Sequence, residues 1–91
     1  MAAREPALTL GLEEEYLLVD RETGAVASEP PEELFSILEK RTSGRAFPEL
    51  LKAQIEVVTP VCGSIHEARR ELAALRQAVI EESRNFGLAP I

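Results

Sequence analysis

Glutamate residues inside strand-like segments are the feature of this sequence that points to chemistry. Of its 16 acidic residues only Asp20 is an aspartate, and most of the glutamates fall in segments predicted to be helical, which glutamate favours. Glu13 and Glu15 lie two positions apart in a segment rich in apolar residues, and Glu56 lies in a second apolar segment. Because glutamate is depleted in strands and like charges oppose sheet pairing, these three positions call for an explanation.

Two carboxylates at positions i and i+2 of a strand lie about 7 Å apart and point to the same side. They repel one another unless a cation lies between them, and hard divalent cations such as Mg²⁺ prefer carboxylate oxygens. If the two segments pair, Glu56 can join Glu13 and Glu15, which predicts a site for Mg²⁺ or Mn²⁺. The same alternation is also typical of the solvent-facing side of an antiparallel sheet, and the pattern alone does not decide between the two interpretations.

Two strands are predicted to position these acids. Residues 8–19 alternate with a period of two, and this period together with Gly11 favours a strand over a helix. Glu14 is then expected to point away from Glu13 and Glu15. Residues 20–24 predict a turn into a short arm at 25–27, which together form a hairpin. The second strand is expected at residues 53–59, with Gln54 on the face of Glu56.

Two helices are predicted beside these strands. The first is expected from Ser28, as a capping residue, to about Lys40, and residues 41–48 are expected to form a polar connection. The second is expected from the Ser64-x-x-Glu67 capping box to about Phe86. The residues assigned to its buried face are Ala68, Leu72, Leu75 and Val79, with Ile65 as a further candidate. Gly87 is suited to a left-handed helix end, after which residues 88–91 approach another strand.

Composition limits the classes of function. The net charge of -6 opposes binding to nucleic-acid phosphates, and no apolar run is long enough for a membrane span. The single Cys62 and the absence of a signal-peptide core indicate a cytoplasmic protein. Cys62 is expected to be a small buried residue, and His66 is expected at the surface or in a helix cap rather than in a catalytic site.

Three segments together resemble a known family. They are Leu8-Thr-Leu-Gly-Leu-Glu-Glu-Glu-Tyr-Leu-Leu-Val-Asp20, Glu49-Leu-Leu-Lys-Ala-Gln-Ile-Glu-Val-Val-Thr-Pro-Val-Cys62 and Glu67-Ala-Arg-Arg-Glu-Leu72. In this order and separation they are similar to the start of the carboxylate-amine ligase family, also called type 2 glutamate-cysteine ligases. The resemblance runs from Leu8 to Leu88.

The resemblance implies an α+β fold, the N-terminal fragment of a glutamine-synthetase-like domain in which an antiparallel sheet carries acidic metal ligands. It implies a ligase that uses ATP and Mg²⁺ or Mn²⁺ to activate a carboxylate as an acyl phosphate, which an amine then attacks. Glu13, Glu15 and Glu56 match the metal-binding acids. Because Gln54 shares the predicted face of Glu56, it is expected to contact substrate or to orient a ligand carboxylate. Glu49 matches a further acid but ranks lower, because its odd offset from Glu56 would place it on the opposite face of a straight strand.

Residues 1–7 are expected to be a flexible leader, and residues 8–91 the incomplete N-terminal part of one catalytic domain. The expected partners are ATP, amino-acid substrates and the missing C-terminal part, without nucleic acid or membrane. The isolated 91 residues are expected to be inactive, and an exposed sheet edge would favour homo-oligomers or aggregation. The alternative is a non-catalytic acidic α/β module that associates through its long helix.

Overall fold

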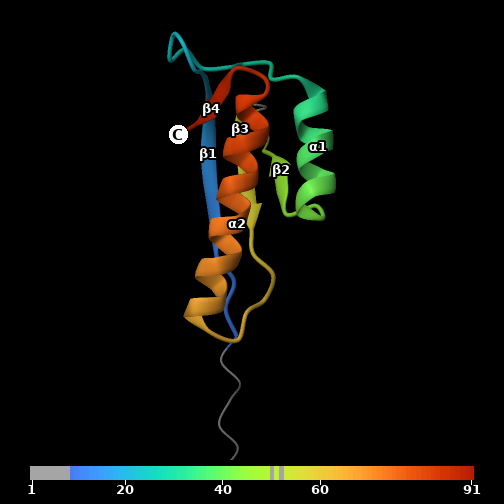
Figure 1. Ribbon diagram of the computed structural model, residues 1–91, viewed down its shortest axis with the longest axis vertical. Helices are drawn as coiled ribbons and strands as arrows, with labels where there is room; N and C mark the ends of the chain where they lie inside the picture. Colours follow the sequence, from blue (N-terminus) through green and yellow to red (C-terminus); the bar gives the residue numbers. More distant parts are fainter. Residues whose placement is uncertain (1–8, 50, 52) are drawn as a thin grey trace, which may run out of the picture.

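An antiparallel sheet packed against two helices forms the computed structural model, which describes residues 9–49, 51 and 53–91 (Figure 1). The elements are β1 (Glu13–Asp20), α1 (Glu32–Thr42), β2 (Ala46–Pro48), β3 (Gln54–Val58), α2 (Ile65–Arg84) and β4 (Leu88–Pro90). The four strands lie in the order β2-β3-β1-β4, and each neighbouring pair is antiparallel. The predicted α+β class with an antiparallel sheet is confirmed. The leader expected at residues 1–7 lies outside the described residues.

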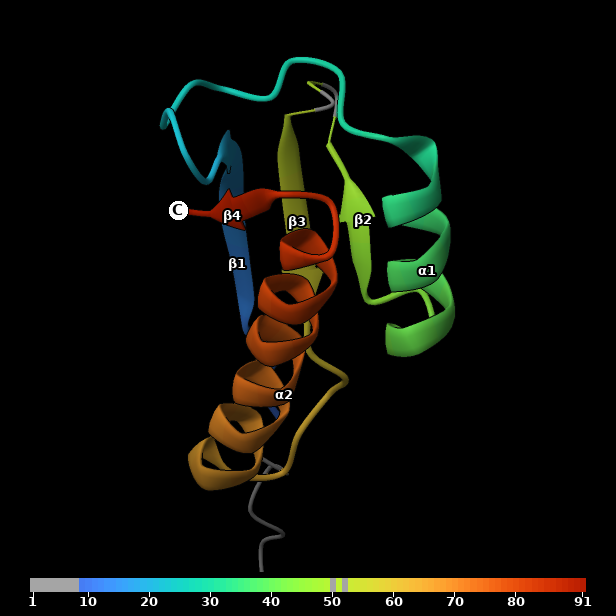
Figure 2. The same ribbon diagram turned by 45° about the horizontal axis from the view of Figure 1, so that its top comes forward.

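Helix α2 runs along one face of the sheet, and α1 packs beside α2 and β2 (Figures 1 and 2). Leu18, Ile55 and Val57 are fully buried beneath the helices because alternate strand residues point to that side. The core cluster comprises Leu18, Leu34, Leu38, Ala46, Ile55, Val57, Leu72, Leu75, Ala78, Val79 and Leu88. Burial of these side chains is the main term that holds sheet and helices together.

The first strand is shorter than the predicted 8–19, and Leu8 lies outside the described residues. Of the described residues before β1, Leu10 forms an isolated bridge with Cys62, and the Leu12 carbonyl accepts a hydrogen bond from the Thr59 N–H at 2.8 Å. Between this bridge and the Glu13–Val58 pair, the segment that follows β3 contains one residue more than the segment that precedes β1. Pro60 has no N–H for the ladder, and the Leu12 N–H instead donates to Thr59 Oγ1 at 2.8 Å. The strand predicted at 53–59 is confirmed as β3.

The predicted hairpin after β1 is present, although its second arm is reduced to one bridge between Val19 and Val26. The Asp20 carboxylate accepts hydrogen bonds from the N–H groups of Glu22 and Thr23, both at 2.9 Å, which stabilises the turn.

Helix α1 begins later than predicted. Its N-cap is Pro31 and no side chain caps it, so the assignment of Ser28 as the cap is wrong. Pro30 precedes another proline and is therefore restricted to extended conformations, which delays the helix.

The polar connection predicted for residues 41–48 is wrong at both ends. Arg41 and Thr42 complete α1, and residues 46–48 form the short strand β2. Ser43 and Gly44, with φ values of 54° and 77°, reverse the chain between them. Three residues are too few to show a period of two, which explains why the sequence pattern did not indicate this strand.

The Ser64 cap predicted for the long helix is confirmed in α2, but Glu67 bonds to the N–H of Gly63 and not to that of Ser64, so the reciprocal half of the capping box is absent. The Ser64 side chain accepts from the Glu67 N–H at 3.1 Å, and Glu67 Oε2 accepts from the Gly63 N–H at 3.0 Å. The predicted buried face is confirmed at Ala68, Leu72, Leu75 and Val79, but Ile65 is 66% exposed and does not belong to it. Gly87, with a φ of 73°, allows the chain to turn from α2 into β4, the strand that the last residues were expected to approach.

Candidate metal centre

The acids selected from the sequence lie on the sheet face opposite the helices. Glu15 pairs directly with Glu56 across β1 and β3, and Glu13 pairs with Val58. Since paired residues and residues two apart share a face, Glu13, Glu15 and Glu56 all point to the same side. Glu13 and Glu15 are exposed and Glu56 is half-buried. The structure therefore brings the three carboxylates to one face, and their role as metal ligands stays a prediction.

Glu49 also belongs to this face, which corrects the reason for ranking it lower. The chain reverses after β2, so Glu49 and Glu56 do not lie on one straight strand. The Glu49 N–H donates to the Gln54 carbonyl at 2.9 Å, which continues the pairing of β2 with β3. Glu49 thus lies opposite Gln54, and both share the face of Glu56.

The electrostatics of this face show an excess of negative charge. The pKa of Glu56 is raised to about 7, first because it can share a proton with Glu49. Partial burial and the negative charges of Glu49 and Glu13 raise this pKa further. A carboxyl that holds its proton near neutral pH lacks a nearby positive charge, and a bound cation would supply one.

The candidate ligands Glu13, Glu15 and Glu56 suit Mg²⁺ or Mn²⁺, because their carboxylates provide hard oxygen atoms. Within the part of the chain that the structure describes, no three acidic, histidine or cysteine side chains form an arrangement that could already hold an ion. Binding of an ion at this face would therefore require the side chains to rotate.

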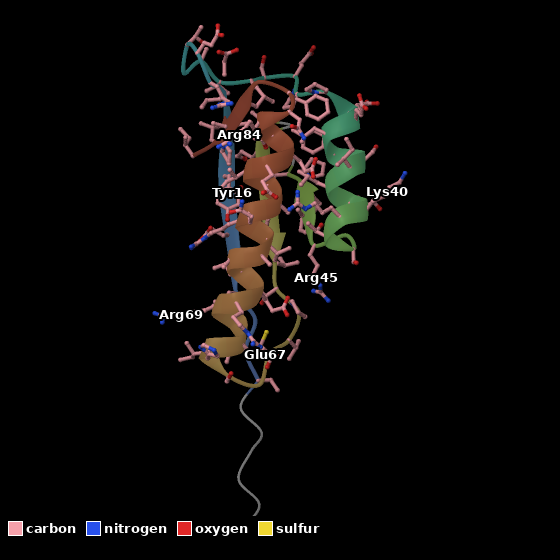
Figure 3. The ribbon with its side chains drawn as sticks, viewed as in Figure 1. Tyr16, Lys40, Arg45, Glu67, Arg69 and Arg84 are labelled. Carbon is pink, nitrogen blue, oxygen red and sulfur yellow. The ribbon has the colours of Figure 1, made fainter. Side chains whose placement is uncertain are left out.

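Glu14 points to the helix side of the sheet, as its position on the strand predicts. Arg76 of α2 donates to both of its carboxylate oxygens, through Nε at 2.6 Å and Nη2 at 2.5 Å. The Tyr16 hydroxyl donates to the same carboxylate, and Tyr16 lies between β1 and α2 (Figure 3). Hydrogen bonding from Arg76 lowers the pKa of Glu14, whereas burial and the bond to Glu14 raise the pKa of Tyr16. Both groups therefore keep one charge state near neutral pH.

Ion pairs connect α2 to the strand β1 and to the helix α1. Arg76 pairs with Glu14 of β1. Glu81 and Glu82 both pair with Arg41 of α1. Arginine reaches a carboxylate on another element when the elements pack closely, and a helical repeat cannot reveal such a partner.

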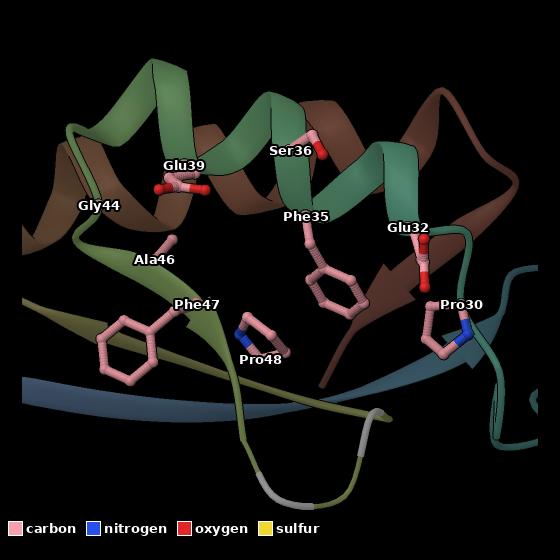
Figure 4. A pocket seen from close by; sticks show the side chains of 9 residues that line it. All are labelled: Pro30, Glu32, Phe35, Ser36, Glu39, Gly44, Ala46, Phe47 and Pro48. Atoms are coloured by element: carbon pink, nitrogen blue, oxygen red, sulfur yellow. The ribbon is translucent and has the colours of Figure 1, made fainter.

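A groove between α1 and β2 has a mostly apolar lining, unlike the acidic face (Figure 4). Its volume is about 510 Å³. Its lining residues are Pro30, Glu32, Phe35, Ser36, Glu39, Gly44, Ala46, Phe47 and Pro48. Because this lining is mostly apolar and contains none of the predicted metal ligands, the groove is not the candidate metal centre.

Cys62 and His66 lie outside the acidic cluster. Cys62 is 1% exposed, and its Sγ lies 3.1 Å from the Pro60 carbonyl oxygen. Burial raises the pKa of its thiol, which keeps it protonated and unreactive. The prediction of a small buried residue is confirmed. His66 is exposed in the first turn of α2, as expected.

The model of the family described as "Glutamate-cysteine ligase family 2 (GCS2)" matches residues 9–90. This range includes both acid-bearing strands and both helices.

Similar proteins named "Putative glutamate--cysteine ligase 2" occur in several bacteria. The chain is 53% identical to one from Rhodospirillum rubrum over 97% of its length, 45% identical to one from Paracoccus denitrificans over 96%, and 52% identical to one from Jannaschia over 91%. These matches cover only 24%, 23% and 22% of the three relatives. The chain therefore spans about a quarter of their length.

Proposed function

Since the chain belongs to glutamate-cysteine ligase family 2, we propose that it supplies the metal-binding face of an ATP-dependent carboxylate-amine ligase. The observation that carries this proposal is the gathering of Glu13, Glu15 and Glu56 on the face that α2 leaves uncovered. In the proposed cytoplasmic protein, this sheet belongs to a larger, glutamine-synthetase-like domain that also binds ATP and the amino-acid substrates.

In the proposed reaction a substrate carboxylate oxygen bonds to the γ-phosphorus of ATP, and ADP leaves. The amine then attacks the acyl carbon of the acyl phosphate, inorganic phosphate leaves, and the amine loses a proton. When bound, Mg²⁺ or Mn²⁺ neutralises the charge that develops on the phosphate oxygens. Glu13, Glu15 and Glu56 would hold that ion, and Glu49 is placed to complete the set.

Gln54 is proposed to contact substrate beside these acids. It is half-buried on the same face, two positions from Glu56. Its side-chain amide offers both a donor and an acceptor, which suits the carboxylate or amine of an amino acid.

The alternative of a non-catalytic module associating through its long helix receives less support. The stripe of α2 that suggested this role is Ala68, Leu72, Leu75 and Val79, and these residues are buried within the described chain. An interface needs apolar residues that are accessible, and this stripe packs on the chain's own sheet.

The proposal can be tested with a polypeptide of the relatives' full length that contains this segment. With ATP, Mg²⁺, glutamate and cysteine, we expect ADP release that stops when EDTA removes the metal. Hydroxylamine in place of the amine should trap the activated carboxylate as a hydroxamate. A panel of other amino acids tests the substrate pair. ADP release unaffected by EDTA, or none with any pair, would contradict the proposal.

A further inference from the structure

Arg76 connects α2 to the strand that carries two of the proposed metal ligands. Its guanidinium makes two hydrogen bonds to the Glu14 carboxylate, and Tyr16 makes a third. A planar guanidinium fork fixes the orientation of a carboxylate, whereas a lysine ammonium does not. The group therefore holds two β1 side chains against α2.

This clamp of Arg76, Glu14 and Tyr16 lies directly behind the acidic face. Glu14 is the chain neighbour of both Glu13 and Glu15, and strand alternation sends it to the other side. Residues that hold Glu14 and Tyr16 in place also restrict rotation of β1 about its own axis. Such a rotation would change the direction in which Glu13 and Glu15 point.

The clamp acts where β1 has few other restraints. Strand β4 pairs with β1 only at Leu18, Val19 and Asp20, and the Leu17–Ile91 hydrogen bonds end this contact. Among the described strands, only β3 pairs with residues 13–16. In addition to this pairing and to the packing of Leu12 and Tyr16 against the core, the clamp fixes this end of the strand to α2.

We propose that Arg76 is a positioning residue for the metal site: by holding Glu14 it aims Glu13 and Glu15 at the cation. This inference rests on the proposed function. A positioning role and a purely electrostatic role of Arg76 predict opposite effects on cation binding, so an experiment can distinguish them. Loss of the positive charge alone would make the site more attractive to a cation, whereas loss of positioning would weaken cation binding.

The test measures Mn²⁺ binding to the full-length polypeptide by the loss of the free-ion electron paramagnetic resonance signal. For Arg76→Gln we expect the Kd for Mn²⁺ to rise about tenfold, a size typical of residues that orient metal ligands. Arg76→Lys should also weaken binding, because it keeps the charge but loses the fork. Arg69→Gln is the matched control, since Arg69 is exposed on the same helix and projects away from it (Figure 3).

Steady-state kinetics separate positioning from a general loss of structure. In Arg76→Gln the metal concentration for half-maximal rate should rise, while the rate at saturating metal changes by less than about twofold. A uniform loss of rate at unchanged metal dependence would overturn the inference, as would unchanged or tighter Mn²⁺ binding in this variant.

The Arg76 side chain is 51% exposed, so its replacement should leave the fold intact. If Arg76→Gln nevertheless fails to fold, Arg76→Lys decides by the same criteria. Failure of the unsubstituted protein to bind Mn²⁺ would instead defeat the proposed function.

Discussion

Glu13, Glu14 and Glu15 are consecutive in the chain, yet the strand places them in different environments. The Glu14 side chain is 27% exposed and is neutralised by Arg76. Glu13 and Glu15 are exposed on the other face, where Glu15 lies directly opposite Glu56. Like charges that face each other across two strands destabilise the pair, typically by up to about 1 kcal/mol. A bound cation would convert this repulsion into attraction.

Replacing Glu15 by glutamine should therefore separate stability from activity. In the proposed ligase we expect Glu15→Gln to lower ATP turnover by at least about 100-fold, because it removes a ligand of the ion that stabilises the phosphoryl group. Without metal, the melting temperature should stay equal or rise, since the repulsion from Glu56 is reduced. ADP release and thermal unfolding check the two effects.

Glu14→Gln is the matched control at the next position. Its side chain keeps the size of glutamate and points to the helix side, so turnover at saturating metal should remain within about tenfold of the unsubstituted protein. If Glu14→Gln lost as much activity as Glu15→Gln, the acidic face would not be the catalytic face.

Glu56 should make metal binding and stability depend on pH. Its pKa is raised to about 7 from an ordinary value of 4.5, so the folded state retains a proton that the unfolded state has released. Between about pH 4.5 and pH 7, stability of the metal-free protein should therefore fall as the pH rises. Mn²⁺ must displace the same proton, so its affinity should increase over this interval. Thermal melts and Mn²⁺ titrations at several pH values check both trends.

Glu49→Gln tests the cause of this pH dependence. The largest contribution to the raised pKa of Glu56 is hydrogen bonding with Glu49, and a glutamine amide at that position can donate to the ionised carboxylate. The midpoint of both pH profiles should move to lower pH. An unchanged midpoint would place Glu49 outside the cluster.

Among the elements, those with strong local signals were predictable from the sequence. The sequence of α2 contains the Ser64-x-x-Glu67 pattern and a regular apolar stripe, and that of β3 contains a run of β-branched residues. Strand β2 is too short, and its composition too ordinary, to be predicted from the sequence. It is recognised by its pairing with β3. The placement of Glu49 was missed for the same reason, because it depends on the reversal that β2 creates.

The contact between Arg76 and Glu14 was equally beyond sequence reasoning. The two residues are 62 positions apart, and nothing in a helical or strand repeat relates them. The three acids of the candidate site could be found because alternation within each strand is local. Their assembly on one face depended on the register between the strands, which the structure supplies.

The start of α2 offers a prediction at the scale of an element. Ser64→Ala removes the acceptor for the Glu67 N–H and should lower the free energy of unfolding by about 1 kcal/mol. Chemical denaturation of the variant and the unsubstituted protein checks this value. Ser36→Ala, at an exposed position of α1, is the control and should have little effect. Equal losses in both variants would show that the cap contributes nothing specific.

At the scale of the whole molecule, the two sides of the sheet carry different chemistry. The open face gathers acids, whereas Arg41 and Arg76 are held in ion pairs with helix-side partners. The outer strands β2 and β4 are each three residues long and end in Pro48 and Pro90, which lack an N–H for further pairing. The Ala46 N–H already donates to Thr42 Oγ1 at 3.0 Å. These features limit the edge pairing that an open sheet edge would otherwise favour.

Neither described helix combines the length and apolar character of a membrane span. The acidic face carries the residues proposed as metal ligands, Glu13, Glu15 and Glu56. Phosphoryl transfer also requires positive groups on the side of the phosphates, positioned together with the metal. In the described chain the paired arginines lie on the other side of the sheet from the candidate ligands.

The isolated 91-residue chain should therefore release no ADP from ATP in the presence of Mg²⁺ and amino acids. It covers about a quarter of the relatives, and we expect the remainder of such a protein to supply further groups that bind nucleotide and substrates. Adding that remainder as a separate polypeptide should restore ADP release if the two parts assemble. A second preparation with Glu15→Gln in the short chain should stay inactive after mixing, because the restored site would still lack a ligand. Turnover by the short chain alone would overturn the prediction, and inactivity of both the mixture and the intact protein would favour a non-catalytic module.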